Sequence, residues 1–96
     1  MTTRFEWNDE KDRSNRRKHG VSFAEAVSAF ADPHSLYMPD PDHSVDEERF
    51  VLIGRSAKFR ILVVCHCYRE ADTVIRIFSA RKALRGEFFE YEERIP

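Results

Sequence analysis

Residues 49–79 read RFVLIGRSAKFRILVVCHCYREADTVIRIFS, and this stretch decides the fold. It contains three runs rich in β-branched and aromatic residues, at 49–55, 59–68 and 73–79, which predict three strands. The connections between the runs are only three and four residues long, too short for the crossover that parallel neighbours need. The sequence therefore predicts an antiparallel sheet at the centre of the fold.

The segment before this sheet predicts a strand followed by a helix. Residues 3–7 alternate between polar and apolar side chains, which is typical of a half-buried strand. Asn8 is a suitable N-cap, acidic residues follow it, and basic residues precede Gly20, so a helix is predicted over residues 8–18. None of these helical residues is apolar, and a helix that is polar on all sides needs side-chain pairs or a special role. We expect that role to be functional.

The next segment predicts a second helix that packs on the core. Ser22 and Glu25 form an S-x-x-E capping box at its start. The residues that recur at helical spacing and form its apolar face are Phe23, Ala26, Val27 and Phe30. The helix ends at Asp32-Pro33, because a residue that precedes proline avoids the helical conformation.

The remaining segments complete an α+β domain. Residues 36–38 predict a short strand, and the acidic, proline-containing residues 39–48 predict a loop. A last helix is predicted to begin at Ser79 as its N-cap. The apolar residues on one face of this helix are Leu84, Phe88, Tyr91 and Ile95. We therefore expect one α+β domain over residues 1–96, in the order β-α-α-β-β-β-β-α, with an antiparallel sheet.

The composition excludes several classes of protein. With 42% hydrophobic and 34% charged residues, the chain is too apolar for intrinsic disorder and too charged for a membrane protein. Its longest apolar run, Ile61 to Cys65, is far shorter than the ~20 residues that cross a bilayer. No apolar segment follows the first methionine, so we expect no secretory signal, no contact with a membrane and a cytoplasmic location.

The charges are strongly segregated along the chain although the net charge is only −1. Residues 21–48 contain seven acids and neither Lys nor Arg, whereas in residues 49–85 the bases outnumber the acids by seven. This pattern predicts a basic surface and an acidic one. Basic surfaces concentrate phosphates, although both runs can also be ordinary solvated faces.

The run Cys65-His66-Cys67 resembles half of a metal site. However, strand alternation turns His66 to the face opposite the two thiols, and structural zinc needs four converging ligands. The same alternation places both cysteines on one face in a geometry unsuited to a mutual disulfide. We therefore predict no metal, no cofactor and two free thiols.

Arginine is the strongest candidate for function. Arg76 lies within the apolar run Val74–Phe78, where a guanidinium group needs an anionic partner. That partner is either a nucleic-acid phosphate or one of the three acids at positions 46–48 across the sheet. RNA cleavage without a metal needs a base, a cation for the charged transition state and an acid for the leaving oxygen. His19 and His66 are the candidates that titrate near neutral pH.

Several motifs resemble one family. The matching residues are Phe5-Glu6-Trp7, Lys18-His19-Gly20-Val21-Ser22-Phe23, Asp32-Pro33, Pro39-Asp40-Pro41-Asp42-His43, Glu48-Arg49, Ile75-Arg76-Ile77 and Ser79-Ala80-Arg81. Together they resemble the BrnT family of bacterial type II toxins over nearly the whole chain. The resemblance implies a RelE-like fold and a metal-independent endoribonuclease that inhibits growth by cleaving RNA.

The resemblance also implies partners and site residues. The partner is a BrnA-like antitoxin that carries a ribbon-helix-helix DNA-binding part, and the toxin meets DNA only through that operon-repressing complex. The residues implied in catalysis by matched position are Lys18, Arg49, Arg76 and Arg81, followed by His19, His66 and Tyr91.

Two other functions remain open from the sequence. One is a non-catalytic member that only binds nucleic acid or an antitoxin in operon regulation, and the other is a plain RNA- or DNA-binding domain. The surface for the antitoxin is also open. Either a basic antitoxin segment docks on the acidic residues 32–48, or an acidic segment covers the basic residues 49–85.

Overall fold

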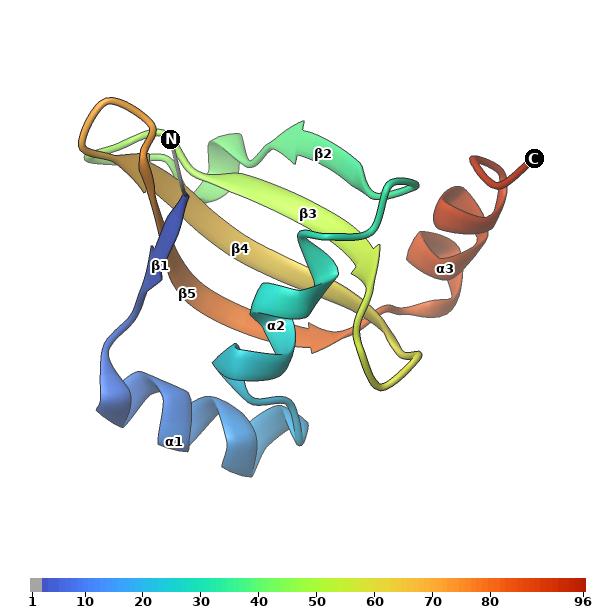
Figure 1. Ribbon diagram of the computed structural model, residues 1–96, viewed down its shortest axis with the longest axis horizontal. Helices are drawn as coiled ribbons and strands as arrows, with labels where there is room; N and C mark the ends of the chain where they lie inside the picture. Colours follow the sequence, from blue (N-terminus) through green and yellow to red (C-terminus); the bar gives the residue numbers. More distant parts are fainter. Residues whose placement is uncertain (1–2) are drawn as a thin grey trace.

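The computed structural model describes residues 3–96 and shows an α+β fold built on a five-stranded sheet, in the strand order β1-β5-β4-β3-β2 (Figure 1). The elements are β1 (Arg4–Glu6), α1 (Asp9–His19), α2 (Phe23–Ala29), β2 (Leu36–Pro39), the short 3-10 helix η1 (Pro41–His43), β3 (Phe50–Arg55), β4 (Ile61–Arg69), β5 (Val74–Lys82) and α3 (Arg85–Glu92). The predicted class and the predicted order of elements are confirmed.

The pairing of the strands is antiparallel except at one edge. The pairs β2–β3, β3–β4 and β4–β5 are antiparallel as predicted, whereas β1 runs parallel to the first residues of β5. A parallel pair is possible there because α1, α2 and three strands separate β1 from β5 along the chain, which leaves ample length for the crossover. The sheet is therefore mixed.

A bulge in β5 changes which side chains face which side of the sheet. Cys65 pairs with Ser79 and His66 pairs with Ile77, so Phe78 is an extra residue on β5. Side chains alternate along a regular strand, and one extra residue reverses the alternation beyond it. As a result Arg81 lies on the same face of the sheet as Phe78.

The last helix begins later than the sequence predicts. Residues 79–82 belong to β5, where they pair with β4, and α3 starts only at Arg85. The prediction that Ser79 caps the helix is wrong, because the ladder to β4 satisfies more backbone groups than one cap does. The amide of Leu84 at the start of α3 instead donates a 2.8 Å hydrogen bond to the carboxylate of Glu87.

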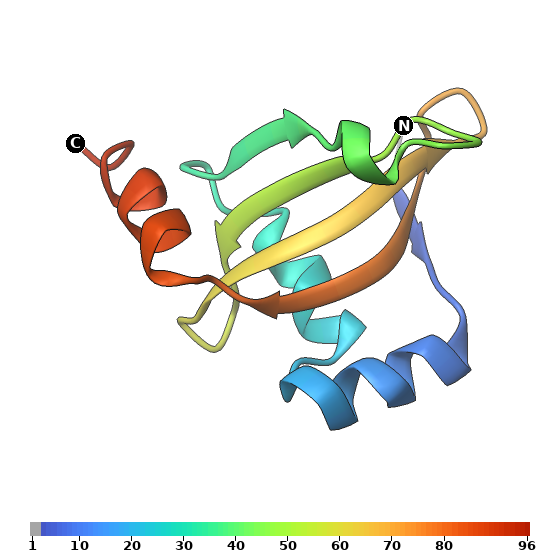
Figure 2. The same cartoon turned by 180° about the vertical axis from the view of Figure 1, so that it is seen from behind.

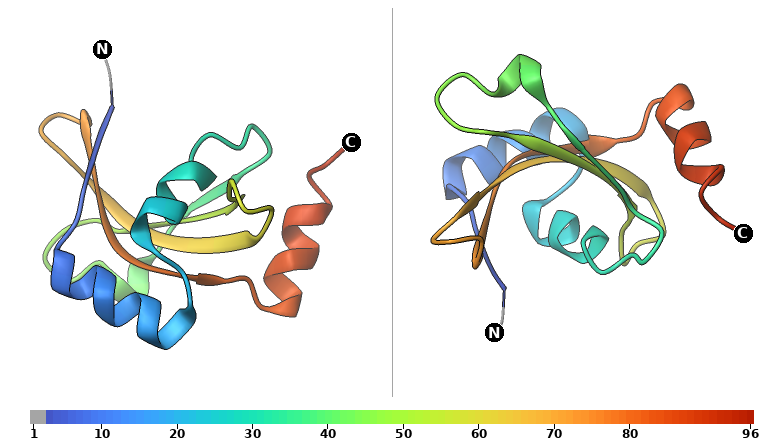
Figure 3. Two further views of the ribbon diagram at one scale, coloured as in Figure 1. Left: turned by 60° about the horizontal axis from the view of Figure 1, so that its bottom comes forward. Right: turned by 90° about the horizontal axis from the view of Figure 1, so that it is seen from above.

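Helix α2 packs on the concave side of the curved sheet (Figure 3). The buried residues of this core are Val21, Phe23, Ala26, Leu62, Val64, Ile77 and Ala80, so the predicted apolar face of α2 is confirmed. The helix approaches β3 so closely that a Cβ atom at Gly54 would lie 2.8 Å from the carbonyl oxygen of Ala29. Only glycine fits that position.

Glu25 ties α2 to the turn between β3 and β4. Ser22 caps the helix as predicted, since its side chain accepts a hydrogen bond from the amide of Glu25. The Glu25 carboxylate, however, accepts hydrogen bonds from the guanidinium of Arg60. It also accepts one from the hydroxyl of Ser56, at a distance of 2.7 Å. The bond with Arg60 lowers the pKa of Glu25 despite its burial.

Helix α3 packs on the other face, at one end of the sheet. Tyr91 is fully buried against Ile53 and Val63. The predicted apolar face is only partly correct, because Leu84 is 65% exposed and Phe88 is 39% exposed. Among the described residues, no further α-helix packs over the rest of that face of the sheet, which is seen in Figure 2.

Helix α1 is attached to the sheet by one amide side chain. Asn15 is buried, and its Nδ2 donates to the carbonyls of Val21 (2.8 Å) and Ala80 (2.7 Å). Its Oδ1 accepts from the amide of Ala80 at 3.2 Å. The β1 ladder covers only residues 74–76 of β5, so the Asn15 amide takes the place of a strand neighbour at Ala80. This arrangement explains how a helix without an apolar residue packs on the molecule.

Candidate active site

A basic cleft on the sheet face opposite α2 is lined by residues of α1, of the loop that contains η1 and of the strands. Two adjoining hollows of about 250 Å³ each share Lys11, Phe78 and Ser79 and so form one continuous cleft. Its other lining residues are Ser14, Asn15, Lys18 and His19 from α1, Asp40, His43 and Arg49 from the loop, and Val51, Val63, Cys65 and Arg81 from the strands. Six cationic or imidazole side chains therefore line the cleft: Lys11, Lys18, His19, His43, Arg49 and Arg81.

Helix α1 presents one face to the cleft. Lys11 and Lys18 are seven residues apart, which places both ammonium groups on the side of the helix that lines the hollows. The cap contacts that fix the helix are those the sequence predicts. The side chain of Asn8 accepts from the amide of Lys11, and Gly20 closes the helix with φ +68°. The polar character of α1 therefore serves the cleft.

Arg49 and Phe78 form the centre of the cleft. The guanidinium carbon of Arg49 lies 3.8 Å from the ring centroid of Phe78, and the ammonium group of Lys11 lies 5.7 Å from the same centroid. Both distances are within the range of cation–π attraction. The nearest carboxylate to Arg49 is that of Glu47, at 3.9 Å. Arg49 is therefore held by an aromatic face and retains donors for an anion.

Arg81 is held more tightly. Its two terminal nitrogens donate to the two carboxylate oxygens of Glu87 at 2.7 and 2.8 Å. This pairing raises the pKa of Arg81 and lowers the pKa of Glu87. Since Glu87 also accepts from the amide of Leu84, the start of α3 fixes the position of the Arg81 side chain.

An imidazole–carboxylate pair lies at the rim of the cleft. The Nδ1 atom of His43 is 2.8 Å from Oδ2 of Asp40, and the His43 side chain is 66% exposed. A carboxylate on Nδ1 fixes the tautomer and leaves Nε2 free to take or give a proton. Sequence reasoning did not select His43 as a site residue. The D-x-x-H spacing of Asp40 and His43 is the signal that points to it.

Cys65 lies between these groups and is not activated. Burial raises the pKa of its thiol, and the negative charge of Asp40 adds to the effect. A protonated thiol is a poor nucleophile. Cys65 and Cys67 are free thiols, as the sequence predicts.

The structure brings four of the predicted site residues together and separates three from them. Lys18, His19, Arg49 and Arg81 line the basic cleft. Arg76, His66 and Tyr91 do not line it.

Each of the three separated residues has a structural partner. Arg76 donates to Glu6 of β1 at 2.7 Å, so the expected salt bridge exists but not with residues 46–48. His66 is fully buried on the α2 side, and burial lowers its pKa. The hydroxyl of Tyr91 donates to Asp32 at 2.5 Å, and the burial of Tyr91 raises its pKa to about 12. We therefore do not include these three in the proposed site.

Within residues 3–96, no three His, Cys, Asp or Glu side chains are grouped so that they hold a metal ion. No helix in the same part of the chain is long and apolar enough to cross a bilayer.

The chain is an α+β protein with a basic cleft on one face of its sheet, and a solved structure shares this fold. The solved structure of the Brucella abortus ribonuclease toxin BrnT is similar, with a TM-score of 0.67 and 21% sequence identity, over 88% of this chain and 100% of that chain. At this identity the likeness shows that the two proteins share a fold.

The sequence itself shows the family. Residues 7–87 match the family model described as ribonuclease toxin, BrnT, of type II toxin-antitoxin system. The chain therefore belongs to the BrnT family, and it is a ribonuclease toxin whose partner is an antitoxin. No curated protein gives a significant match to the sequence.

Proposed function

We propose that this toxin cleaves RNA in the basic cleft without a metal ion, by attack of a ribose 2′-hydroxyl on the adjacent phosphorus. The observation that supports this proposal concerns the two adjoining hollows of the cleft. Lys11, Arg49 and Arg81 line the hollow that also holds the His43–Asp40 pair, and Lys18 lines the hollow next to it. The site thus contains both the charge and the proton carrier that such a reaction needs.

The cations differ in their roles. Lys11, Lys18 and Arg49 keep donors free for the phosphates of the RNA chain. Arg81 is fixed by Glu87, and a fixed guanidinium stabilises the charge that develops on the phosphoryl oxygens without having to reorganise. The ring of Phe78 supplies an apolar floor between them.

His43 moves the proton in this proposal. Its Nε2 removes the proton from the 2′-hydroxyl, the oxygen–phosphorus bond forms, and the bond to the 5′-oxygen breaks. The leaving 5′-oxygen takes a proton from the imidazolium or from water, so the products are a 2′,3′-cyclic phosphate and a 5′-hydroxyl. Asp40 holds the imidazole in the orientation that this transfer needs.

The proposal extends to the partner and the location. The antitoxin is a BrnA-like protein with a ribbon-helix-helix part, the toxin contacts DNA only as part of that complex, and the pair acts in the cytoplasm. The segregated charge supports an electrostatic interface, since the loop 40–48 exposes carboxylates beside the basic cleft.

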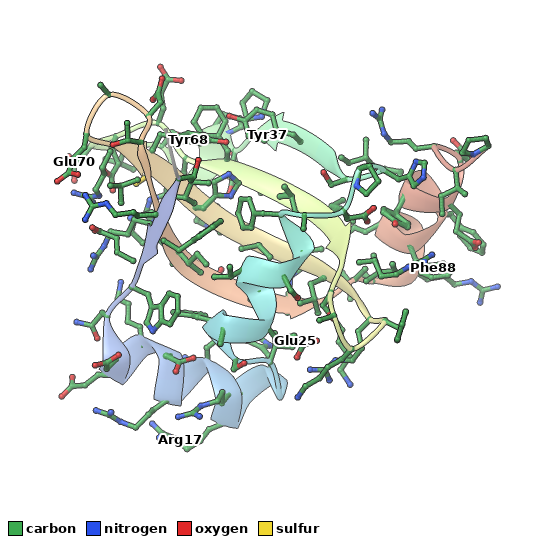
Figure 4. All side chains as sticks on the ribbon, viewed as in Figure 1. Arg17, Glu25, Tyr37, Tyr68, Glu70 and Phe88 are labelled. Atoms are coloured by element: carbon green, nitrogen blue, oxygen red, sulfur yellow. The ribbon has the colours of Figure 1, made fainter. Side chains whose placement is uncertain are left out.

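The experiment is an RNA-cleavage assay with the purified chain in EDTA. We expect cleavage in EDTA, with the rate reduced about 100-fold or more by Arg49→Ala or by His43→Gln. Arg17→Ala is the matched control, because Arg17 projects from α1 away from the sheet (Figure 4). Loss of cleavage in EDTA, or full activity of both cleft variants, contradicts the proposed mechanism.

A second candidate is an inactive member that binds RNA without cutting it. Arg81 favours this candidate, because both of its terminal nitrogens are already paired with Glu87. Salt-sensitive RNA binding by the purified chain, with no cleavage under any condition, identifies this second function.

A further inference from the structure

A separate pocket lies at the far end of the sheet, beyond α2. It has a volume of about 490 Å³ and is lined by three aromatic rings and three carboxylates: Tyr37, Phe50, Tyr68, Glu47, Glu48 and Asp72. Figure 4 shows Tyr37 and Tyr68 side by side at this end of the molecule. The proposed RNA cleft does not use the three rings or the carboxylates of Glu48 and Asp72.

The three rings form a connected wall. Tyr37 stacks on Phe50 with centroids 5.1 Å apart and planes at 17°, and Tyr68 packs edge-on to Phe50 at 5.5 Å. Tyr37 is 48% exposed. Contiguous apolar surface of this kind marks an interaction site more often than a single exposed ring does.

Two of the three carboxylates around the wall carry unneutralised charge, whereas Glu47 pairs with Arg69 at 3.2 Å. Glu48 and Asp72 are exposed, and within residues 3–96 neither forms an ion pair or a side-chain hydrogen bond. Burial raises the pKa of Tyr37, and the neighbouring Tyr68 and the charges of Asp72 and Glu48 raise it further. An aromatic wall beneath negative charge attracts cations through both Coulomb and cation–π forces.

A buried polar atom behind the wall also lacks a partner. His66 is fully buried, and its ring contacts all three rings of the pocket. Its Nδ1 lies 3.1 Å from the carbonyl of Val64, so Nδ1 carries the proton and Nε2 is a free acceptor. No donor reaches Nε2 in the described structure. This unused acceptor lies directly behind the three rings, although His66 itself does not line the pocket.

We propose that this pocket binds an arginine side chain of the antitoxin. This proposal rests on the proposed function, which names the antitoxin as the partner, and it places one contact of the antitoxin in this pocket. A planar guanidinium group stacks on an aromatic ring and donates to carboxylates at its edge, which matches Tyr37 and Tyr68 with Glu48 and Asp72. A nucleobase could stack on the same rings, but its phosphate would be repelled by the carboxylates.

The test uses acetyl-arginine amide as the probe. We expect it to shift the ring resonances of Tyr37 and Tyr68 in NMR spectra of the full chain, whereas the neutral isostere acetyl-citrulline amide shifts neither. The double variant Glu48→Gln/Asp72→Asn should weaken probe binding at least fivefold. Asparagine suits position 72 because it tolerates the backbone there, where φ is +68°.

The matched control is Glu90→Gln/Glu92→Gln, which removes two exposed charges from α3 and should leave probe binding unchanged. The affinity for the antitoxin itself should fall at least fivefold in the pocket variant and not in the control. Equal binding of arginine and citrulline amides, or shifts with AMP instead of arginine, overturns the proposal. Self-association that acetyl-arginine amide disrupts also overturns it, because the occupant is then a second copy of the chain.

RNA cleavage separates this proposal from the proposed function. The pocket variant should cleave RNA at the same rate as the unmodified chain, since Glu48 and Asp72 do not line the basic cleft. Arginine binding without RNA cleavage would contradict the proposed function and leave the cation pocket intact. Cleavage without arginine binding would contradict the pocket alone.

Discussion

The four histidines show that surroundings decide which imidazole is useful. His43 is exposed beside a carboxylate at the rim of the basic cleft, whereas His66 is enclosed among aromatic rings on the other side of the sheet. The sequence selects His66 because it lies in the basic segment, and His43 lies in a loop that composition marks as acidic. The burial of a strand residue can be predicted only when it is known which face of the sheet is covered. The choice between His43 and His66 therefore needs the structure.

The burial of His66 leads to a prediction about stability and pH. Burial keeps the pKa of His66 in the folded chain below its ordinary value of about 6.5, so the unfolded chain binds a proton first as the pH falls. The contribution of His66 to stability is therefore complete above about pH 6.5 and is lost as the pH falls from there toward the lower folded pKa. We expect a loss of at most about 1.4 kcal/mol per pH unit from this group.

Urea unfolding at pH 7 and pH 5.5 measures this effect. His66→Phe removes the titrating group, so the variant should lose about 1 kcal/mol less stability between the two pH values than the unmodified chain does. His19→Gln is the control and should behave like the unmodified chain, because His19 is exposed. Identical pH profiles for the His66 variant and the unmodified chain would refute this account.

At the scale of elements, α1 depends on its single buried amide. Asn15→Asp keeps the shape of the side chain but removes the donors to Val21 and Ala80, leaving two buried carbonyls without partners. We expect a loss of about 2–4 kcal/mol in the free energy of unfolding. Ser14→Asp adds the same charge one residue earlier, where no such bonds exist among the described contacts, and should cost much less. A loss below about 1 kcal/mol for Asn15→Asp would show that other contacts hold α1.

Elements defined by local signals could be predicted, and those defined by distant pairing could not. The caps at Asn8 and Ser22 and the apolar face of α2 act within one or two helical turns, so the sequence contains the whole signal. The end of β5 depends on its pairing with β4, a partner that lies about twenty residues away in the sequence. This pairing extends β5 past Ser79, although the local sequence favours a helix cap there. The parallel pairing of β1 has no local signature.

The candidate site could be predicted only in part, because the types of its residues are visible in the sequence but the pairing of its strands is not. Residue type alone selects Arg49 and Arg81 as cations, but it does not show that they share a face. That result depends on the extra residue Phe78, which reverses the alternation of β5 between Arg76 and Arg81. Without the bulge, Arg81 would point toward α2.

At the scale of the molecule, opposite charges occupy different places on one small sheet. The basic cleft lies between α1 and β5, while the carboxylates of the aromatic pocket lie at the far end of the sheet. With a net charge of −1, the chain offers RNA little attraction outside the cleft. The salt dependence of RNA binding should therefore report the cations of the cleft alone.

The free cations of the cleft set the number of phosphate contacts that RNA makes with the chain. Lys11, Lys18 and Arg49 are free to pair with the phosphates of bound RNA, whereas both terminal nitrogens of Arg81 are already bonded to Glu87. For a single-stranded RNA with 2′-O-methyl groups, which cannot be cleaved by 2′-attack, a plot of log K against log salt should have a slope of about −2. Glu87→Gln releases Arg81, so the slope should steepen by about 0.7 and the affinity at low salt should rise. Glu90→Gln removes an equal charge from α3 without touching Arg81 and should leave the slope unchanged. If both variants steepen the slope equally, the RNA responds to overall charge, and the cleft is not the place where its phosphates bind.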